Sequence, residues 1–277
     1  MTYKDILVHV DTLEPCKARL AAAINLAKAF DARLTGLFVR ATPYIPQYAE
    51  AQISPEILEA QARDLKRIAA EAAKTFKAAT ESSGVKTEWR SIEGDSLDVI
   101  SLQARYFDLV VVGQGNPADI LLPGDRNMPD NVIMTCGRPT LVVPYVGKYP
   151  VIGRNVMIAW DASATATRAV HDAMPFLKAA KAVTVMVVNP MTTTRGIGDL
   201  PGADMAAHLA RHGVKAEADH VQCDLEAGDM LLSRAADKGA DLIVMGAYGH
   251  ARWREIVLGG VTDHILNHMT VPVLMSH

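Results

Sequence analysis

Two parts of this chain repeat the same pattern, and the repeat constrains the fold more than any other feature. Residues 4–11 read KDILVHVD and residues 154–161 read RNVMIAWD, so each combines a basic residue, an apolar run and a closing aspartate. DLVVVG at residues 108–113 likewise matches DLIVMG at residues 241–246. Repeats this far apart exclude solenoids, whose units span about 20 to 50 residues, and indicate a duplicated domain.

The distances between the matching segments define the two copies. The first pair is offset by 150 residues and the second by 133. A third pair, RPTLVVP at 138–144 and TVPVLMS at 270–276, has the same offset of 133 when their prolines are aligned. The second copy is therefore 17 residues shorter. These matches predict two domains, residues 1–146 and residues 153–277, joined by a linker at residues 147–153.

Short β-branched runs alternate with helical patterns in the first copy. Strands are predicted at residues 6–10, 33–39, 85–91, 109–112 and 140–143. Helices are predicted at residues 15–30, 55–82 and 96–106, with Ser54 and Asp95 as N-terminal caps.

The second copy repeats the alternation. Its strands are predicted at residues 156–160, 183–188, 215–222, 242–245 and 271–275, and its helices at 165–179, 203–212, 226–238 and 261–268. The fold class is therefore α/β: two tandem doubly wound domains, each a five-stranded parallel sheet flanked by helices. A TIM barrel would need about eight βα units in one closed set.

The last strands of the two copies are apolar and would lie at an edge of each sheet. An exposed apolar edge strand invites pairing, and duplication supplies the partner within the same chain. We therefore expect residues 140–143 to pair with residues 271–275 about a pseudo-twofold axis. A homodimer of the whole chain through another surface stays an alternative.

Composition excludes several classes of protein. With 28 Lys+Arg against 31 Asp+Glu in 277 residues, no polybasic surface for nucleic acid is expected. Cys16, Cys136 and Cys223 form no CxxC pair, which argues against a disulfide framework or a thiolate zinc site, and the nine histidines show no metal-binding spacing. The chain shows no signal peptide and no apolar run long enough to cross a bilayer, so we expect a cytoplasmic protein without membrane contact.

A glycine series follows the fourth strand of the second copy. Gly246, Gly249 and Gly259 have the spacing G-x2-G-x9-G, and Arg252 lies among them. Glycines let backbone N–H groups approach phosphate oxygens, and the N-terminus of a following helix offers further N–H groups with the positive end of its dipole. Glycines after a strand are also common as turn residues, so a purely structural turn is the alternative.

This glycine series, together with the strand ending in Asp161 and the closing PVL strand, resembles the nucleotide-binding members of the universal stress protein family over essentially the whole chain. The resemblance implies a stress or signalling protein that binds ATP, with Mg²⁺ to balance the triphosphate charge. It also implies that Asp161 holds the ribose and that backbone near Val188 receives the adenine. The backbone of Gly259 would then contact the phosphates.

One position departs from the family pattern. Nucleotide-binding members usually have Ser or Thr directly after the third glycine, whereas this chain has Gly260. A hydroxyl contact is lost there, but the backbone N–H groups of Gly260 and Val261 remain and Thr262 lies two residues on. The Arg252 and Arg254 side chains could supply charge to the phosphates, or stay solvated.

The first copy lacks the signature. Its fourth strand is followed by Gly113, Asn116 and Gly124, with asparagine at the position of the second glycine, and Asp119 and Asp125 add negative charge. Phosphate binding is therefore expected in the second copy alone. Asp11 keeps the ribose position, so a nucleoside or another small ligand of the first copy stays an alternative, as does its use as a helix cap.

No catalytic arrangement accompanies these features. The turns after the first strands, DTLEP and DASAT, lack the Ser-Gly-Gly loop of ATP pyrophosphatases, and HIGH, KMSKS, Walker and GxGxxG motifs are absent. No nucleophile paired with a base is apparent. We expect at most slow ATP hydrolysis, and a scaffold or interaction protein of the same fold without nucleotide is the competing hypothesis.

Overall fold

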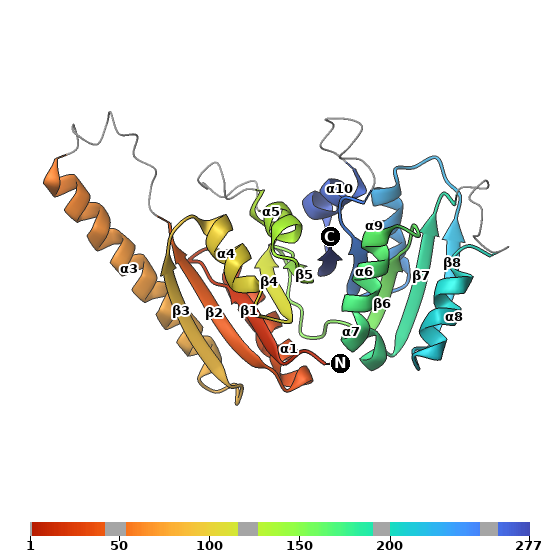
Figure 1. Ribbon diagram of the computed structural model, residues 1–277, viewed down its shortest axis with the longest axis horizontal. Helices are drawn as coiled ribbons and strands as arrows, with labels where there is room; N and C mark the ends of the chain where they lie inside the picture. Colours follow the sequence, from red (N-terminus) through yellow and green to blue (C-terminus); the bar gives the residue numbers. More distant parts are fainter. Residues whose placement is uncertain (1, 42–53, 116–126, 191–199, 250–259) are drawn as a thin grey trace.

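The computed structural model describes residues 2–41, 54–115, 127–190, 200–249 and 260–277. In the first half of the chain the elements are β1 (Asp5–His9), α1 (Cys16–Phe30), β2 (Arg33–Arg40), α3 (Pro55–Thr80), β3 (Thr87–Glu93), α4 (Ser96–Ala104), β4 (Leu109–Gly113), α5 (Met128–Thr135) and β5 (Thr140–Val143). The second half contains β6 (Asn155–Ala159), α6 (Ala164–Asp172), α7 (Met174–Ala179), β7 (Ala182–Val188), α8 (Ala203–Arg211), β8 (Ala216–Val221), α9 (Ala227–Asp237), β9 (Leu242–Gly246), α10 (Val261–His268) and β10 (Val273–Ser276). Figure 1 shows the two halves side by side.

The strands form one ten-stranded sheet in the order β3-β2-β1-β4-β5-β10-β9-β6-β7-β8. Within each half, every pair of neighbouring strands in the described residues is parallel, which confirms the predicted α/β fold of two doubly wound units. Strands β5 and β10 join the halves in antiparallel pairing, with Leu141 opposite Leu274. The predicted pseudo-twofold pair is therefore confirmed.

Helices cover both faces of the sheet and bury one hydrophobic core on each. The core on one face receives side chains from α1, α3, α6, α7 and α8, and the core on the other receives them from α4, α5, α9 and α10. Both cores extend across the β5–β10 seam, so the two halves share their interiors. Burial of this continuous apolar surface stabilises the association of the halves, in addition to the strand pairing.

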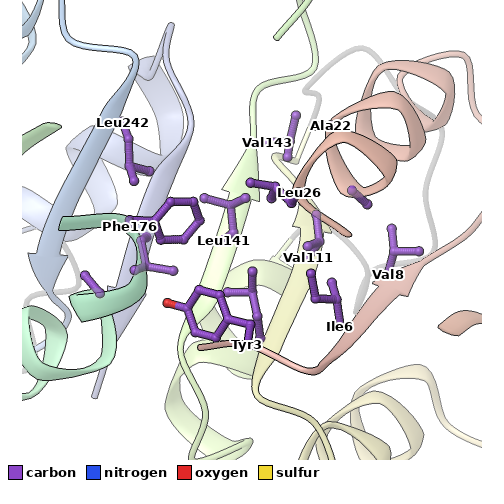
Figure 2. Close-up of a cluster of buried hydrophobic side chains, with 14 of the residues drawn as sticks. Tyr3, Ile6, Val8, Ala22, Leu26, Val111, Leu141, Val143, Phe176 and Leu242 are labelled. Carbon is purple, nitrogen blue, oxygen red and sulfur yellow. The ribbon is translucent and has the colours of Figure 1, made fainter. Parts of the chain in front are cut away.

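Three aromatic rings lie at the junction of the halves. Phe176 of α7 packs edge-to-face against Tyr3 and Phe30, with ring centroids 5.5 and 5.1 Å away. Figure 2 shows Tyr3 and Phe176 facing one another near Leu141 of β5. The Tyr3 hydroxyl also donates a hydrogen bond to the Asp172 carbonyl oxygen at 2.7 Å, so its polar end is satisfied.

Some predicted elements need correction. The helix expected at residues 165–179 is two helices separated at Ala173, because Pro175 has no N–H to donate within a continuous helix. Helix α5 was not predicted, since it is only eight residues long and begins with Met-Pro. Asp95 caps α4 as predicted, whereas Ser54 occupies the cap position of α3 without a side-chain hydrogen bond to the helix.

Two further observations bear on the sequence expectations. Cys16 and Cys136 are buried and Cys223 is half-buried, all as free thiols. Among the helices of the described ranges, none combines the length and the apolar character of a membrane span.

Candidate functional site

The residues predicted to bind a ligand in the second half lie at the carboxyl ends of parallel strands. Asp161 follows β6, Val188 ends β7 and Gly246 ends β9. Because β6 lies between β7 and β9 in the sheet, these ends are neighbours along one edge. Ligands of open α/β sheets bind at this edge.

The turn after β9 packs against the first turn of α6. A Cβ atom at Gly246 would lie 2.4 Å from the Ala166 amide nitrogen, and one at Gly249 would lie 2.8 Å from Thr165 Oγ1. Glycine at 246 is therefore required by close contact with helix backbone. The glycine spacing predicts phosphate access at this position but gives no sign of its packing role.

Asp161 lies in the loop that leads into α6. Its Oδ1 accepts a hydrogen bond from the Ser163 amide at 2.9 Å, and Ala162 between them has φ 61°. The cap of α6 is Ser163, whose Oγ accepts from the Ala166 amide and lies 3.2 Å from Thr165 Oγ1. Asp161 is exposed, and no cation pairs with its carboxylate among the described residues. It is therefore available to a ligand.

The start of α10 completes the edge. Gly260 is the N-cap residue, exposed and in extended conformation, with open space around the position of a Cβ. Val261 is half-buried, and Thr262 is buried with its hydroxyl accepting a hydrogen bond from the Tyr248 amide at 3.3 Å. The Thr262 side chain thus ties the turn after β9 to α10. Gly259 and Arg252, which were also predicted to bind phosphate, lie outside the described residues.

The end of β7 is held by its own contacts. Val188 is half-buried and pairs with Val221 of β8. The next residue, Asn189, has φ 50°, and its side-chain oxygen accepts a hydrogen bond from the Cys223 amide at 2.8 Å. Backbone at the end of β7 is therefore positioned by a left-handed turn that also anchors the loop after β8.

Tyr248 links this turn to the other half of the chain. Its hydroxyl hydrogen-bonds the carboxylate of Asp130 in α5. Nothing in the sequence predicts this contact, because the two residues are 118 positions apart and neither belongs to a motif. A ligand at the second-half edge would therefore lie beside a direct connection to α5.

The equivalent edge of the first half is built differently. The Arg19 guanidinium lies 2.6 Å from Asp11 Oδ2, and its Nε donates to the His9 carbonyl oxygen at 2.8 Å. Arg19 is only 3% exposed, and a Cβ atom at Gly113 would lie 2.2 Å from its Nη1. Asp11 is not a helix cap, since α1 begins after Pro15. Its other oxygen accepts from the Leu13 amide.

Electrostatics at this first-half edge favour a neutral set of groups. Burial would raise the pKa of Asp11, but the neighbouring Arg19 charge, His9 and the hydrogen bonds from Arg19 and Leu13 together lower it. Burial lowers the pKa of His9 to about 4, with Arg19 lowering it and Asp11 opposing. At neutral pH the carboxylate and guanidinium cancel and the imidazole is uncharged.

These groups border a pocket of about 170 Å³. The pocket is lined by His9, Val10, Asp11, Leu13, Pro15, Arg19, Phe38, Val39, Ala41, Ser96, Gly113, Gln114, Gly115, Met128 and Pro129. The sequence contained a signal for the difference between the halves. At the offset of 150 residues, Ala159 corresponds to His9 and Ala169 corresponds to Arg19.

The comparison with known families decides what kind of protein this fold represents. The sequence profile described as "Universal stress protein family" matches residues 2–144 and again residues 153–277. The chain belongs to the universal stress protein family. It is a tandem, two-domain member, as the resemblance of the glycine series and the strand ends had indicated.

Individual relatives are more distant. Universal stress protein Slr1230 of Synechocystis sp. is 26% identical over 189 residues, which cover 65% of this chain and 62% of that protein. Universal stress protein MJ0577 of Methanocaldococcus jannaschii is 42% identical over 41 residues, 15% of this chain and 25% of that protein. The chain therefore matches less than two thirds of the length of either relative.

A solved structure supports the fold across the whole chain. A universal stress protein from Archaeoglobus fulgidus DSM 4304 superposes with a TM-score of 0.74, covering 98% of this chain and 95% of that chain at 18% identity. The similarity therefore includes the arrangement of both halves. At this identity it establishes the fold alone.

Proposed function

We propose that this universal stress protein binds an adenine nucleotide, ATP with Mg²⁺, at the strand ends of its second half, and acts in stress response or signalling. The observation that carries the proposal is the difference between the two aspartates. Asp161 is exposed and bears no counter-charge within the described residues, whereas Arg19 neutralises Asp11. The carboxylate at the second-half sheet edge is therefore available to a polar ligand, whereas the one at the first-half edge is already paired with Arg19.

The second-half edge offers groups suited to both ends of a nucleotide. The N-terminus of α10 at the exposed Gly260 has no side-chain cap among the described residues, and its first N–H groups and positive dipole end favour phosphate. The Asp161 carboxylate can accept hydrogen bonds from sugar hydroxyls, and the Ser163 and Thr165 hydroxyls lie beside Gly249. The family resemblance assigns the ribose to Asp161 and the adenine to the region of Val188.

Mg²⁺ would enter this site as part of the nucleotide complex. Among the described residues, no group of three or more His, Cys, Asp or Glu side chains could hold a metal ion. Triphosphate oxygens and water are ligands that Mg²⁺ prefers, and the cation would offset the negative charge of the phosphates. We propose one nucleotide per chain, with the phosphates at α10.

The test uses a matched pair of substitutions at Gly260. Aspartate and asparagine have nearly the same shape, both are favourable N-caps, and space is open around this position. Gly260→Asp places a negative charge at the phosphate position, and we expect ATP affinity to fall at least ~10-fold, whereas Gly260→Asn should stay within ~3-fold of the original chain. Isothermal titration calorimetry with Mg²⁺ and ATP measures both, together with the stoichiometry.

Two outcomes would reject the proposed site. Equal ATP affinity in the two variants would remove the α10 N-terminus from the site, and two equivalent nucleotides per chain would contradict the asymmetry. If neither the original chain nor any variant binds ATP, and no adenine nucleotide is released on denaturation, the scaffold hypothesis is favoured. Gly246→Val is unsuitable as a test, because its side chain would meet the backbone of α6.

A further inference from the structure

The pocket of the first half is a candidate site separate from the proposed nucleotide site. It lies at the carboxyl ends of β1, β2 and β4, and the first residues of α4 and α5 also line it. Strand β1 leads on to β2 on one side of it, whereas its other neighbour, β4, leads on to β5 in the opposite direction, so the chain connections diverge between β1 and β4. Such a switch point is where open α/β sheets bind small molecules.

The polar groups of the pocket carry no net charge. Arg19 and Asp11 form a close ion pair, and His9 is neutral above about pH 4. The Gln114 side chain is already engaged, since it donates to the Leu266 carbonyl oxygen and accepts from the Tyr145 amide. An ionic ligand would therefore lose its hydration without gaining an uncompensated counter-charge.

The remaining lining is largely apolar. Val10, Phe38, Val39 and Met128 are each 9% exposed or less and present apolar surface to the pocket. The volume of about 170 Å³ is slightly above the roughly 150 Å³ of an apolar cavity that binds benzene, and below the roughly 300 Å³ at which typical drug-sized pockets begin. This volume is that of one substituted ring.

The fold itself does not need this polar arrangement. At the corresponding positions of the second half, Ala159 and Ala169 replace His9 and Arg19 in the same strand and helix. Burying a guanidinium and an imidazole costs solvation that two alanines would not. The second half thus forms the same fold without these buried polar groups.

We propose that the first-half pocket binds a compact, uncharged, single-ring molecule that carries one hydroxyl or amide group. The ring would contact Phe38, Val39 and Met128. The polar substituent would exchange hydrogen bonds with the Asp11–Arg19 pair. This inference is independent of the nucleotide proposal, because it concerns other residues and a ligand of different charge.

The test uses phenol as the probe and the Met128 methyl group as the reporter. Methyl-labelled methionine in the full chain gives NMR signals, and Met128→Leu identifies the Met128 signal. We expect phenol to shift this signal with a dissociation constant of order ~1 mM, and benzoate, which has a similar ring but a negative charge, to bind at least ~10-fold more weakly. The other methionine methyl signals report whether the fold is intact.

A pair of variants at Ser96 places the probe inside the pocket. Ser96→Leu fills the space beside the α4 N-terminus and should weaken phenol binding at least ~10-fold, whereas Ser96→Ala, which adds no volume, should change it by less than ~3-fold. An unshifted Met128 signal, equal phenol affinity in the two variants, or benzoate binding as tightly as phenol would overturn the proposal. Displacement of phenol by ATP would also overturn it, since the pocket would then accept a nucleotide.

Discussion

The two halves of this chain share one fold but use the same strand ends differently. In the second half, Asp161 is exposed, and so is Gly260 at the N-terminus of α10. In the first half, Arg19 fills the corresponding corner, neutralises Asp11 and covers Gly113. Fold stability comes from strand pairing and core burial, which the halves share, so the residues at the strand ends can diverge without loss of the architecture.

The largest loss of stability expected from this comparison follows from breaking the Arg19–Asp11 pair. Arg19→Ala, which introduces the residue found at position 169, should lower the free energy of unfolding by about 4 kcal/mol, because it leaves the Asp11 carboxylate partly buried without its partner. Urea denaturation at pH 7 measures the loss.

The control for Arg19→Ala removes both charges. Arg19→Met combined with Asp11→Asn keeps side-chain volume and the acceptor for the Leu13 amide. This double variant should lose clearly less stability than Arg19→Ala. If the double variant loses as much stability or more, packing by the long Arg19 side chain accounts for the loss in Arg19→Ala. The charge difference between the halves would then make no contribution to stability.

A slightly smaller loss of unfolding free energy is expected when the pH is lowered. The pKa of His9 is lowered from 6.5 to about 4 by burial, so the unfolded chain takes up this proton at higher pH than the folded chain. The contribution to stability is complete above about pH 6.5 and is lost as the pH falls toward 4. The loss should amount to about 3 kcal/mol.

This pH dependence distinguishes the two halves, since the second has Ala159 at the matching position. Urea denaturation between pH 7.5 and 4.5 should show a steeper loss of stability in the original chain than in His9→Ala. Asp11 does not interfere, because its lowered pKa confines its effect to still more acidic conditions. Parallel pH profiles for the two proteins would contradict the assignment of a buried, neutral His9.

The smallest expected effect is the difference in unfolding free energy between alanine substitutions at Gly246 and Gly113, the glycines that end β9 and β4. A methyl group at Gly246 would meet the backbone of α6, with the Ala166 nitrogen at 2.4 Å, whereas one at Gly113 would meet the end of the Arg19 side chain. We expect Gly246→Ala to destabilise by about 3 kcal/mol and Gly113→Ala by about 1 kcal/mol, because a side-chain end moves more readily than helix backbone.

Thermal or urea unfolding of the two glycine variants gives the comparison directly. A larger loss for Gly113→Ala would mean that Arg19 is held more rigidly than the helix backbone, and the corner of the first half would then be the stiffer of the two. Equal losses would show that neither strand end depends on the neighbouring helix in the way the contacts indicate.

Local pattern was sufficient for most of the architecture. The repeat predicted two α/β units, the apolar runs located the strands to within a few residues, and helix α10 begins and ends where the pattern predicts. The β5–β10 pair was also predictable, because each copy ends in an apolar edge strand that needs a partner. These features depend on side-chain periodicity and on residues close together in the chain.

The tertiary structure decided what the strand-end residues do. Gly246 serves contact with α6, Thr262 holds Tyr248, and Tyr248 reaches Asp130 in the other half. Each of these roles depends on residues from separate elements, which periodicity does not relate. Arg19 shows the same limit: its position in α1 follows from helical pattern, but its contacts with Asp11 after β1 and with Gly113 of β4 depend on how α1 packs on the sheet. Sequence therefore determined which elements form and in what order, whereas packing of elements distant in the chain determined which polar groups stay open to a ligand.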